Sequence, residues 1–181
     1  GKGVCLALHA LVHLRQQGIQ ARMVVAGDGP DRTALQALGE RLGLREVVEW
    51  RGAVKDMAGF YSKLDVLVHP TLHEALGNVT IEASAFGVPV VATRVDGMAE
   101  TVLHERTGRT VPASQPMSAY AQYGGEAADV LASQVYDPDA DTLQSVGFAH
   151  PEALAEAVAK VIAEPGEYAR MSAAAAAHVR E

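Results

Sequence analysis

Residues 65–93 read DVLVHPTLHEALGNVTIEASAFGVPVVAT, and this stretch decides the fold class. The run from Asp65 to Pro70 is almost continuously apolar, which is typical of a short strand buried on both faces of a sheet. A helical pattern follows over Asn78–Phe86, and Pro89–Thr93 again has the composition of a strand. A strand, a helix and a second strand joined by short links predict parallel pairing, because the helix carries the chain back to the starting edge of the sheet.

The same alternation continues outward on both sides of this stretch. Further helices are expected over Val4–Leu14, Asp31–Leu42, Asp56–Lys63, Gly97–His104, Pro151–Ala163 and Glu167–Arg180. Further strands are expected over Arg22–Ala26, Val47–Arg51 and Gly108–Val111. The sequence therefore predicts an α/β fold, a Rossmann-like parallel sheet flanked by helices. Because 49% of the 181 residues are hydrophobic, residues 1–181 are expected to form a single domain around one core.

Two features depart from a regular α/β domain. The chain opens on a helix, whereas doubly wound domains normally open on a strand, so we expect the sequence to be part of a longer protein. The second feature is the segment between Pro112 and Phe148, which contains Gly124-Gly125 and an Asp-rich turn. We interpret residues 113–148 as an insertion, with one expected helix at about Pro116–Gln134.

The composition excludes several classes of function. Asp and Glu number 22 against 15 Lys and Arg, so the formal net charge is −7. An acidic surface repels phosphate backbones, which argues against nucleic acid as a partner. The single Cys5 excludes an internal disulfide and a cysteine zinc site. Without a long apolar run or a signal peptide, the expected location is cytoplasmic.

A candidate ligand site lies where the strand ending at Pro70 gives way to the helix beginning at Asn78. Ligands of parallel sheets bind at this edge. The backbone N–H groups of Asn78, Val79 and Thr80 lie at the positive end of the helix dipole, where they can hold a phosphate. Gly77, directly before them, lets a ligand approach the backbone closely.

Two carboxylates, Glu74 and Glu82, flank this anion seat. Negative side chains are unfavourable beside a phosphate, which suggests that they serve neutral hydroxyl groups. A carboxylate accepts two hydrogen bonds at once and so suits a vicinal diol of a ribose or hexose. The pattern therefore favours a diphosphate with one sugar towards Glu82 and another towards Glu74.

The residues around this site resemble the C-terminal domain of family-4 glycosyltransferases, which are retaining enzymes of the GT-B fold. The resemblance is carried by Glu74 and Glu82 with seven residues between them, and by the stretches 83–93 and 96–100. Further matches are Lys2-Gly3, Gly27-Asp28-Gly29-Pro30, Gly52, Gly108 and Val111. The resemblance covers about residues 1–112 and resumes from Pro151. It implies one half of a GT-B fold.

The resemblance also implies roles for individual residues. Glu82 would chelate the ribose hydroxyls of the donor nucleotide, and Glu74, the candidate catalytic residue, would contact hydroxyls of the transferred sugar. Lys2 would neutralise the leaving diphosphate as charge builds on it. Residues from Gly52 to Val54 would lie along the base. The expected donor-binding set is completed by Leu76, Gly77, Asn78, Val79 and Gly97.

Three departures from the family pattern bear on the choice of donor. The usual partner arginine, a few residues before the lysine, is absent from this sequence. Leu76 stands where an aromatic residue is frequent, and the 113–148 segment has no counterpart. Family members also place the acceptor site on an N-terminal domain, which this sequence lacks.

The sequence is therefore expected to be the donor-binding domain of a retaining glycosyltransferase, inactive without its N-terminal domain. Its substrate would be a nucleotide diphosphate sugar, with no cofactor and no metal. A saccharide or lipid-linked acceptor would be reached through the missing domain, and a lipid-linked acceptor would bring the full-length protein to a membrane surface. Two alternatives stay open: a ligand-sensing α/β module without catalysis, and a nucleotide-sugar epimerase of the same fold.

Other polar residues have ordinary structural explanations beside their functional ones. His9 and His13 have a spacing that can bind a metal, but a solvated or packed pair is favoured. His69, at the end of a strand, is interpreted as a core residue, whereas His73 could touch the donor or gate the cleft. The stretch Asp137–Asp141 is interpreted as a turn in preference to a metal site.

Overall fold

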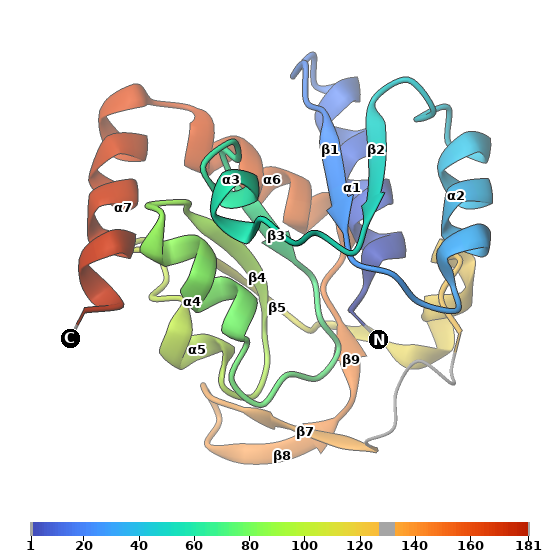
Figure 1. Ribbon diagram of the computed structural model, residues 1–181. Coiled ribbons are helices and arrows are strands. Elements are labelled where there is room, and N and C mark those ends of the chain that lie inside the picture. Colours follow the sequence, from blue (N-terminus) through green and yellow to red (C-terminus); the bar gives the residue numbers. More distant parts are fainter. Residues whose placement is uncertain (1, 127–132, 181) are drawn as a thin grey trace.

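The computed structural model describes residues 2–126 and 133–180 and is drawn in Figure 1. Its principal strands are β1 (Met23–Ala26), β2 (Val48–Gly52), β3 (Leu67–His69), β4 (Val90–Arg94) and β5 (Gly108–Pro112). Strands β1 and β2 form one parallel pair, and β4 lies between β3 and β5 in a second parallel sheet. The expected α/β architecture is confirmed, with the sheet divided in two.

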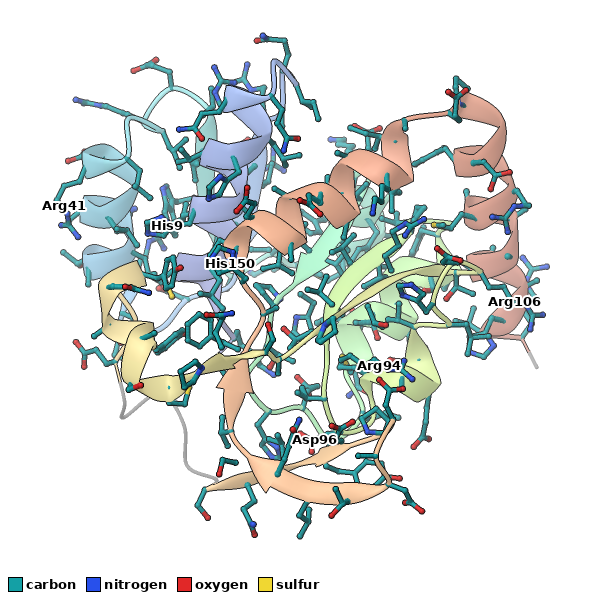
Figure 2. The ribbon with its side chains drawn as sticks, turned by 180° about the vertical axis from the view of Figure 1, so that it is seen from behind. His9, Arg41, Arg94, Asp96, Arg106 and His150 are labelled. Atoms are coloured by element: carbon teal, nitrogen blue, oxygen red, sulfur yellow. The ribbon has the colours of Figure 1, made fainter. Side chains whose placement is uncertain are left out.

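Helices cover both faces of these sheets. They are α1 (Val4–Gln16), α2 (Arg32–Arg41), α3 (Met57–Tyr61), α4 (Asn78–Ala85), α5 (Met98–Thr101), α6 (Pro151–Ile162) and α7 (Pro165–His178). Helix α6 packs on β4 and β5 and against α1, and both lie at the front when the molecule is seen from behind (Figure 2). Helices α4 and α5 pack on β4 from the opposite side, with α7 against α4 (Figure 1).

The fully buried strand is β4, not the run at residues 65–70 on which the sequence expectation rested. Val90, Val91 and Ala92 are completely buried, whereas Leu67 and Val68 of β3 are only partly buried. The reason is position in the ladder, because β4 has a neighbour on each side and β3 pairs with β4 alone. The apolar composition of residues 65–70 thus predicted a strand correctly, but the prediction that this strand is buried on both faces was wrong.

In the described part of the segment 113–148, a shorter helix of another type stands at the start of the α-helix expected over Pro116–Gln134. A 3-10 helix, η1, covers Met117–Tyr123 and ends at Gly124, whose φ of 81° is left-handed. The part of the expected helix at 127–132 lies outside the described residues. The chain continues as an antiparallel hairpin of β7 (Gln134–Asp137) and β8 (Thr142–Ser145).

The ends of this segment are joined to each other and to the core. Strand β6 (Gln115–Pro116) pairs in antiparallel fashion with β9 (Gly147–Phe148). Tyr120 and Phe148 are buried with ring centroids 5.3 Å apart, in the same hydrophobic cluster as the helices and sheets. The ends of the segment therefore belong to the core, and its hairpin contributes the buried Val135 to it; that the segment is an insertion stays a prediction.

Helix α1 begins where only glycine fits. Gly3 has a φ of 64°, and a Cβ atom at this position would collide with the carbonyl oxygen of Pro70. The first turn of α1 is thereby pressed against the end of β3, which places Lys2 next to the loop between β3 and α4.

Helix α5 ends at Thr101, earlier than expected, because Val102 turns to an extended conformation. Among the described residues, no helix is both long enough and apolar enough to cross a membrane.

Candidate functional site

Three separate parts of the chain meet at Glu74, in the loop between β3 and α4. The Lys2 ammonium, at the start of α1, forms an ion pair with Glu74 Oε2. His69, the last residue of β3, places Nε2 3.4 Å from the same oxygen. The Glu74 side chain is mostly buried, with 18% exposure, whereas that of Lys2 is 62% exposed. Two of the predicted site residues, 72 positions apart, are thus in contact.

The charges around Glu74 favour its carboxylate form. Burial by itself raises the pKa of Glu74, but the Lys2 ammonium and the His69 ring outweigh burial and hold that pKa below its ordinary value. Burial, aided by Lys2, lowers the pKa of His69. A neutral His69 can donate to Glu74 only when the proton is on Nε2. The cluster at neutral pH is therefore a carboxylate, one ammonium and a neutral imidazole.

The interpretation of His69 as a core residue captured its burial and missed its contact. Its exposure is 8%, as expected of a core position. The signal that could have found it is its place at the carboxyl end of a parallel strand, where ligand sites form.

The amino end of α4 has the features expected of an anion seat. Gly77 precedes the helix with a φ of 76°, and no side chain caps the helix there. The Thr80 hydroxyl and the Thr80 N–H both donate to the Gly77 carbonyl, at 2.7 and 2.8 Å. Of the three N–H groups expected to form the seat, that of Thr80 is therefore already bonded, which leaves those of Asn78 and Val79. Leu76 and Val79 are exposed on either side, at 48% and 37%. The backbone here is open to a ligand.

Gly77 and Gly97 both shape this loop. A Cβ on Gly77 would collide with the Met98 side chain, and a Cβ on Gly97 would collide with the carbonyl oxygen of Ala75. Helix α5 can therefore pack tightly behind the loop that leads to α4. Gly97 is required by its close approach to the backbone and Gly77 by its left-handed φ, and their contact with a ligand stays a prediction.

Glu82 is held by a residue that the sequence interpretation did not select. The hydroxyl of Tyr61, at the end of α3, donates to Glu82 Oε2 at 2.9 Å. Tyr61 is 2% exposed and stacks on Phe86 with ring centroids 5.8 Å apart. Burial and the carboxylate raise the pKa of Tyr61 above its ordinary value, so the phenol stays a donor. In the part of the chain that the structure describes, Glu82 Oε1 receives no hydrogen bond.

Val54 follows β2 and is partly buried against the hydrophobic core. The chain passes the end of β2 at Gly52, whose φ is 64°. Gly27, at the end of β1, donates its N–H to the Gly52 carbonyl at 2.7 Å. The predicted contact of Val54 with a base stays a prediction.

Asp96, placed between β4 and α5, fixes the backbone of the loop at Glu74. Its Oδ2 accepts the Glu74 N–H at 3.1 Å and lies 2.7 Å from Nδ1 of His73. His73 is thus directed to a neighbouring acid at the rim of the site. Asp96 was noted only within the family series, and its position directly after a parallel strand is the signal that could have singled it out.

The remaining candidates have structural roles. The stretch from Asp137 to Asp141 forms the turn of the β7–β8 hairpin, as expected, and Asp139 pairs with Arg94 at 2.6 Å. The His9 ring packs edge-on against the Tyr123 ring, with the two ring centroids 5.2 Å apart. Among residues 2–126 and 133–180, no three His, Cys, Asp or Glu side chains are placed to hold a metal ion.

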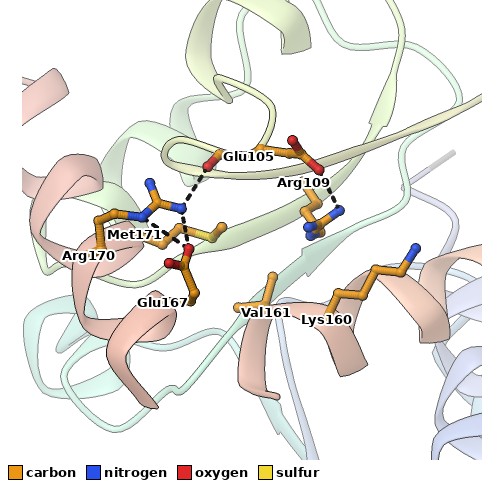
Figure 3. Close-up of a pocket in the computed structure, with 7 residues that line it drawn as sticks. All are labelled: Glu105, Arg109, Lys160, Val161, Glu167, Arg170 and Met171. Carbon is orange, nitrogen blue, oxygen red and sulfur yellow. Dashed lines mark hydrogen bonds and ion pairs between the residues drawn. The ribbon is translucent and has the colours of Figure 1, made fainter. Parts of the chain in front are cut away.

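A pocket of about 160 Å³ lies between β5, α6 and α7 (Figure 3). Its charged groups are mostly paired with one another. Arg109 Nη1 lies 3.3 Å from Glu105 Oε1. Arg170 Nη2 lies 2.6 Å from Glu167 Oε2 and donates to the Glu105 carbonyl at 3.2 Å. The Arg170 bond to the Glu105 carbonyl joins α7 to the loop before β5. A second pocket, of about 240 Å³, lies between α2 and β2. Neither pocket is lined by a residue of the predicted site.

Comparison with known proteins identifies the family of this chain. Residues 1–124 match the family described as glycosyl transferases group 1. Over 119 residues the chain is 37% identical to the GDP-mannose-dependent alpha-(1-6)-phosphatidylinositol monomannoside mannosyltransferase of Mycolicibacterium smegmatis, covering 61% of this chain and 31% of that protein. In alignments with eight curated relatives, the matched segment spans 22–32% of the relative's length.

Solved structures show the same fold at low identity. Anabaena HepE in complex with UDP-glucose has a TM-score of 0.70 at 22% identity, over 98% of this chain and 40% of that chain. The C-terminal domain of a glycosyl transferase group 1 family protein from Francisella tularensis has a TM-score of 0.68 at 16% identity, over 99% of this chain and 78% of that chain. The helix-flanked parallel sheets match glycosyltransferases of the GT-B fold. Because the family match extends over 124 of its 181 residues, this chain belongs to the group 1 glycosyl transferases.

Proposed function

We propose that this chain is the donor-binding domain of a retaining glycosyltransferase and holds a nucleotide diphosphate sugar at the loop between β3 and α4. The observation that carries the proposal is the meeting of Lys2 and Glu74 beside the uncapped start of α4. A cation and a helix amino end suit a diphosphate, and a carboxylate next to them suits sugar hydroxyls. Membership of the group 1 glycosyl transferases supports the same ligand.

The proposed roles follow from these positions. Lys2 and the backbone from Leu76 to Val79 hold the diphosphate. Glu74 accepts hydrogen bonds from the transferred sugar, and Glu82 accepts them from the ribose through the oxygen that Tyr61 leaves free. Before the donor binds, Lys2 and Glu74 form an ion pair with each other. When the donor binds, its phosphate draws the exposed Lys2 ammonium away and leaves Glu74 to the sugar.

Glu74 is proposed as a binding group and not as a nucleophile. Its pKa is lowered and its Oε2 is paired with Lys2, and both effects weaken its attack on carbon. Retention then follows from departure of the diphosphate and attack by the acceptor on the same face of the sugar. The acceptor oxygen bonds to the anomeric carbon, and its proton passes to the leaving phosphate. Lys2 and the start of α4 supply the positive charge, so no metal ion is required.

The acceptor is proposed to be a saccharide or a lipid-linked sugar, reached through an N-terminal domain of the full-length protein. The name of the Mycolicibacterium relative, which specifies a phosphatidylinositol mannoside as acceptor, supports the lipid-linked class. The reaction would take place in the cytoplasm, at a membrane surface where the acceptor is lipid-linked. The net charge of −7 speaks against nucleic acid as an acceptor.

Calorimetric titration tests the proposal. The chain is titrated with UDP, GDP and ADP and with their hexose conjugates, together with Glu82→Gln and Glu156→Gln variants. One nucleotide series should bind, and Glu82→Gln should weaken it about tenfold or more, since a charged hydrogen bond to the ribose is lost. Glu156 is an exposed acid on α6, across the sheet, so its variant should bind normally. Binding that is equally strong in Glu82→Gln would contradict the proposed site.

The same titration separates the other two functions. A ligand-sensing module would bind neither nucleoside diphosphates nor their sugars at this site. An epimerase would convert the nucleotide sugar in the absence of any acceptor, which product chromatography after the titration detects. A donor-binding domain binds the nucleotide sugar and returns it unchanged.

A further inference from the structure

The β7–β8 hairpin of the insertion is joined directly to the loop that carries Glu74, and Asp96 is the joint. Asp96 Oδ1 accepts the backbone N–H of Tyr136, on β7, at 2.8 Å, and the Asp96 N–H donates to the Tyr136 carbonyl at 2.9 Å. The other oxygen, Oδ2, accepts the Glu74 N–H at 3.1 Å and lies 2.7 Å from the His73 ring. One carboxylate therefore bridges the hairpin and the site loop.

The backbone at Asp96 is committed to this arrangement. Its φ of 47° is left-handed, a conformation that Asp tolerates better than most residues because its short side chain bonds to nearby backbone. Its side chain is only 13% exposed. Shielding from water strengthens these hydrogen bonds. A displacement of the hairpin at Tyr136 is therefore expected to displace the loop at Glu74 as well.

The hairpin is also held to the sheet on either side of Tyr136. Arg94, at the end of β4, makes two hydrogen bonds to the Asp139 carboxylate, at 2.7 and 2.6 Å. Val135, next to Tyr136, is 1% exposed within the hydrophobic core. Figure 2 shows Arg94 and Asp96 between the sheet and the hairpin. The hairpin is thus anchored at two points and presents a fixed edge to Asp96.

We infer that Asp96 is a positioning residue through which the β7–β8 hairpin sets the place of Glu74, and with it the preference for the sugar part of the donor. The inference rests on the proposed function, in which Glu74 receives the transferred sugar. It gives the 113–148 insertion a role in sugar selection that leaves the diphosphate seat at α4 unchanged, because none of the four hydrogen bonds of Asp96 reaches that helix.

The experiment compares Asp96→Gly and Asp96→Asn with Asp141→Gly and Asp141→Asn. Asp141 is a matched control because it lies in the turn of the hairpin, has a left-handed φ of 53° and accepts a hydrogen bond from the Tyr136 hydroxyl at 2.7 Å. Among the described residues it makes no hydrogen bond to the loop that carries Glu74. Glycine suits a left-handed backbone, so Asp96→Gly removes the joint without straining the chain. Asparagine keeps the shape and removes the charge.

Two readouts are measured on each variant. The first is amide hydrogen exchange of Glu74 in the ligand-free chain, followed by NMR. It should speed up about tenfold or more in Asp96→Gly, less in Asp96→Asn, and not at all in the Asp141 variants. The second is the ratio of affinities for a nucleotide sugar and for its nucleoside diphosphate. That ratio should fall about three- to tenfold in the Asp96 variants, with the diphosphate affinity itself unchanged.

The outcomes separate this inference from the proposed function. If the Asp96 variants leave both the exchange of Glu74 and the affinity ratio unchanged, Asp96 is not a positioning residue. If exchange speeds up while the affinity ratio holds, the hairpin fixes the loop without selecting the sugar, which also overturns the inference. If the unaltered chain binds no nucleotide, the proposed function fails and sugar selection falls with it, while the exchange readout still decides the joint.

Discussion

The hydroxyl of Tyr61 donates to Glu82 Oε2 at 2.9 Å, from a ring that is 2% exposed. Tyr61→Phe removes this bond and leaves the ring in place. We expect the free energy of unfolding to fall by about 1–2 kcal/mol, since a buried hydrogen bond to a carboxylate is lost. Nucleotide affinity should also fall, by less than in Glu82→Gln, because the carboxylate itself remains. Urea unfolding and calorimetry measure the two effects.

Tyr136→Phe is the control for this change. It removes the phenol hydrogen bond to Asp141 on the exposed hairpin, so stability and nucleotide affinity should hardly change. Equal effects of the two substitutions would show that the Tyr61 hydroxyl has no special relation to Glu82.

Lys2 controls the titration of its neighbours. In Lys2→Met the pKa of Glu74 should rise, since burial then acts with only His69 opposing it. The pKa of His69 should also rise, because Lys2 no longer disfavours its protonation. NMR titration of the Glu74 carboxyl carbon and the His69 ring follows both. An unchanged pKa for Glu74 would mean that the ion pair does not persist in solution, and Lys160→Met on α6 supplies the control.

Gly3 is expected to tolerate no side chain. In Gly3→Ala the new methyl group meets the Pro70 carbonyl as well as a left-handed backbone, so we expect a loss of about 2–3 kcal/mol in unfolding free energy. Gly18 has a similar φ of 83° and open space around it, so Gly18→Ala should cost about 1 kcal/mol from the backbone alone. Chemical denaturation ranks the two. A smaller effect at Gly3 would refute tight packing of α1 on the end of β3.

Stability should decrease as the pH falls below about 6.5, the ordinary pKa of histidine. Burial lowers the pKa of both His69 and His9 in the folded chain. Between the folded value and 6.5 the unfolded chain binds more protons, so the free energy of unfolding rises with pH and its full value is reached above 6.5. His69→Gln and His9→Gln should each flatten this dependence. The expectation would be contradicted if the free energy of unfolding changed equally between pH 7.5 and pH 5 in the unaltered chain and in both variants.

The local pattern of apolar residues predicted the elements of the first 112 residues well, because most of the strands and helices there are bounded by a glycine or a proline. It was less successful for the helix expected over Pro116–Gln134, of which residues 127–132 lie outside the described part. Gly124, with its left-handed backbone, ends a short 3-10 helix after Tyr123. The buried strand was also misplaced, since the rank of β3 and β4 in the ladder depends on pairing partners far away in sequence.

The candidate site was foreseen in part. Glu74 and Lys2 were selected separately, and the structure adds their contact across 72 residues. The roles of Tyr61 and Asp96 were missed because they depend on neighbours 21 and 40 residues away in the sequence. His69 contacts Glu74 only five residues away, and it was missed because its place in a strand suggested a core residue. Sequence spacing identifies groups with the right chemistry, whereas the contacts that hold them in place depend on the folded chain.

The antiparallel pairing of β6 with β9 brings the two ends of the 113–148 segment together. The residues between these strands therefore leave the domain and return to it at the same place. A change of length between these strands therefore need not shift the register of the parallel sheets. The residues that cannot change freely are the few that anchor the segment, namely the buried Tyr120 and Val135 and the Arg94 partner Asp139.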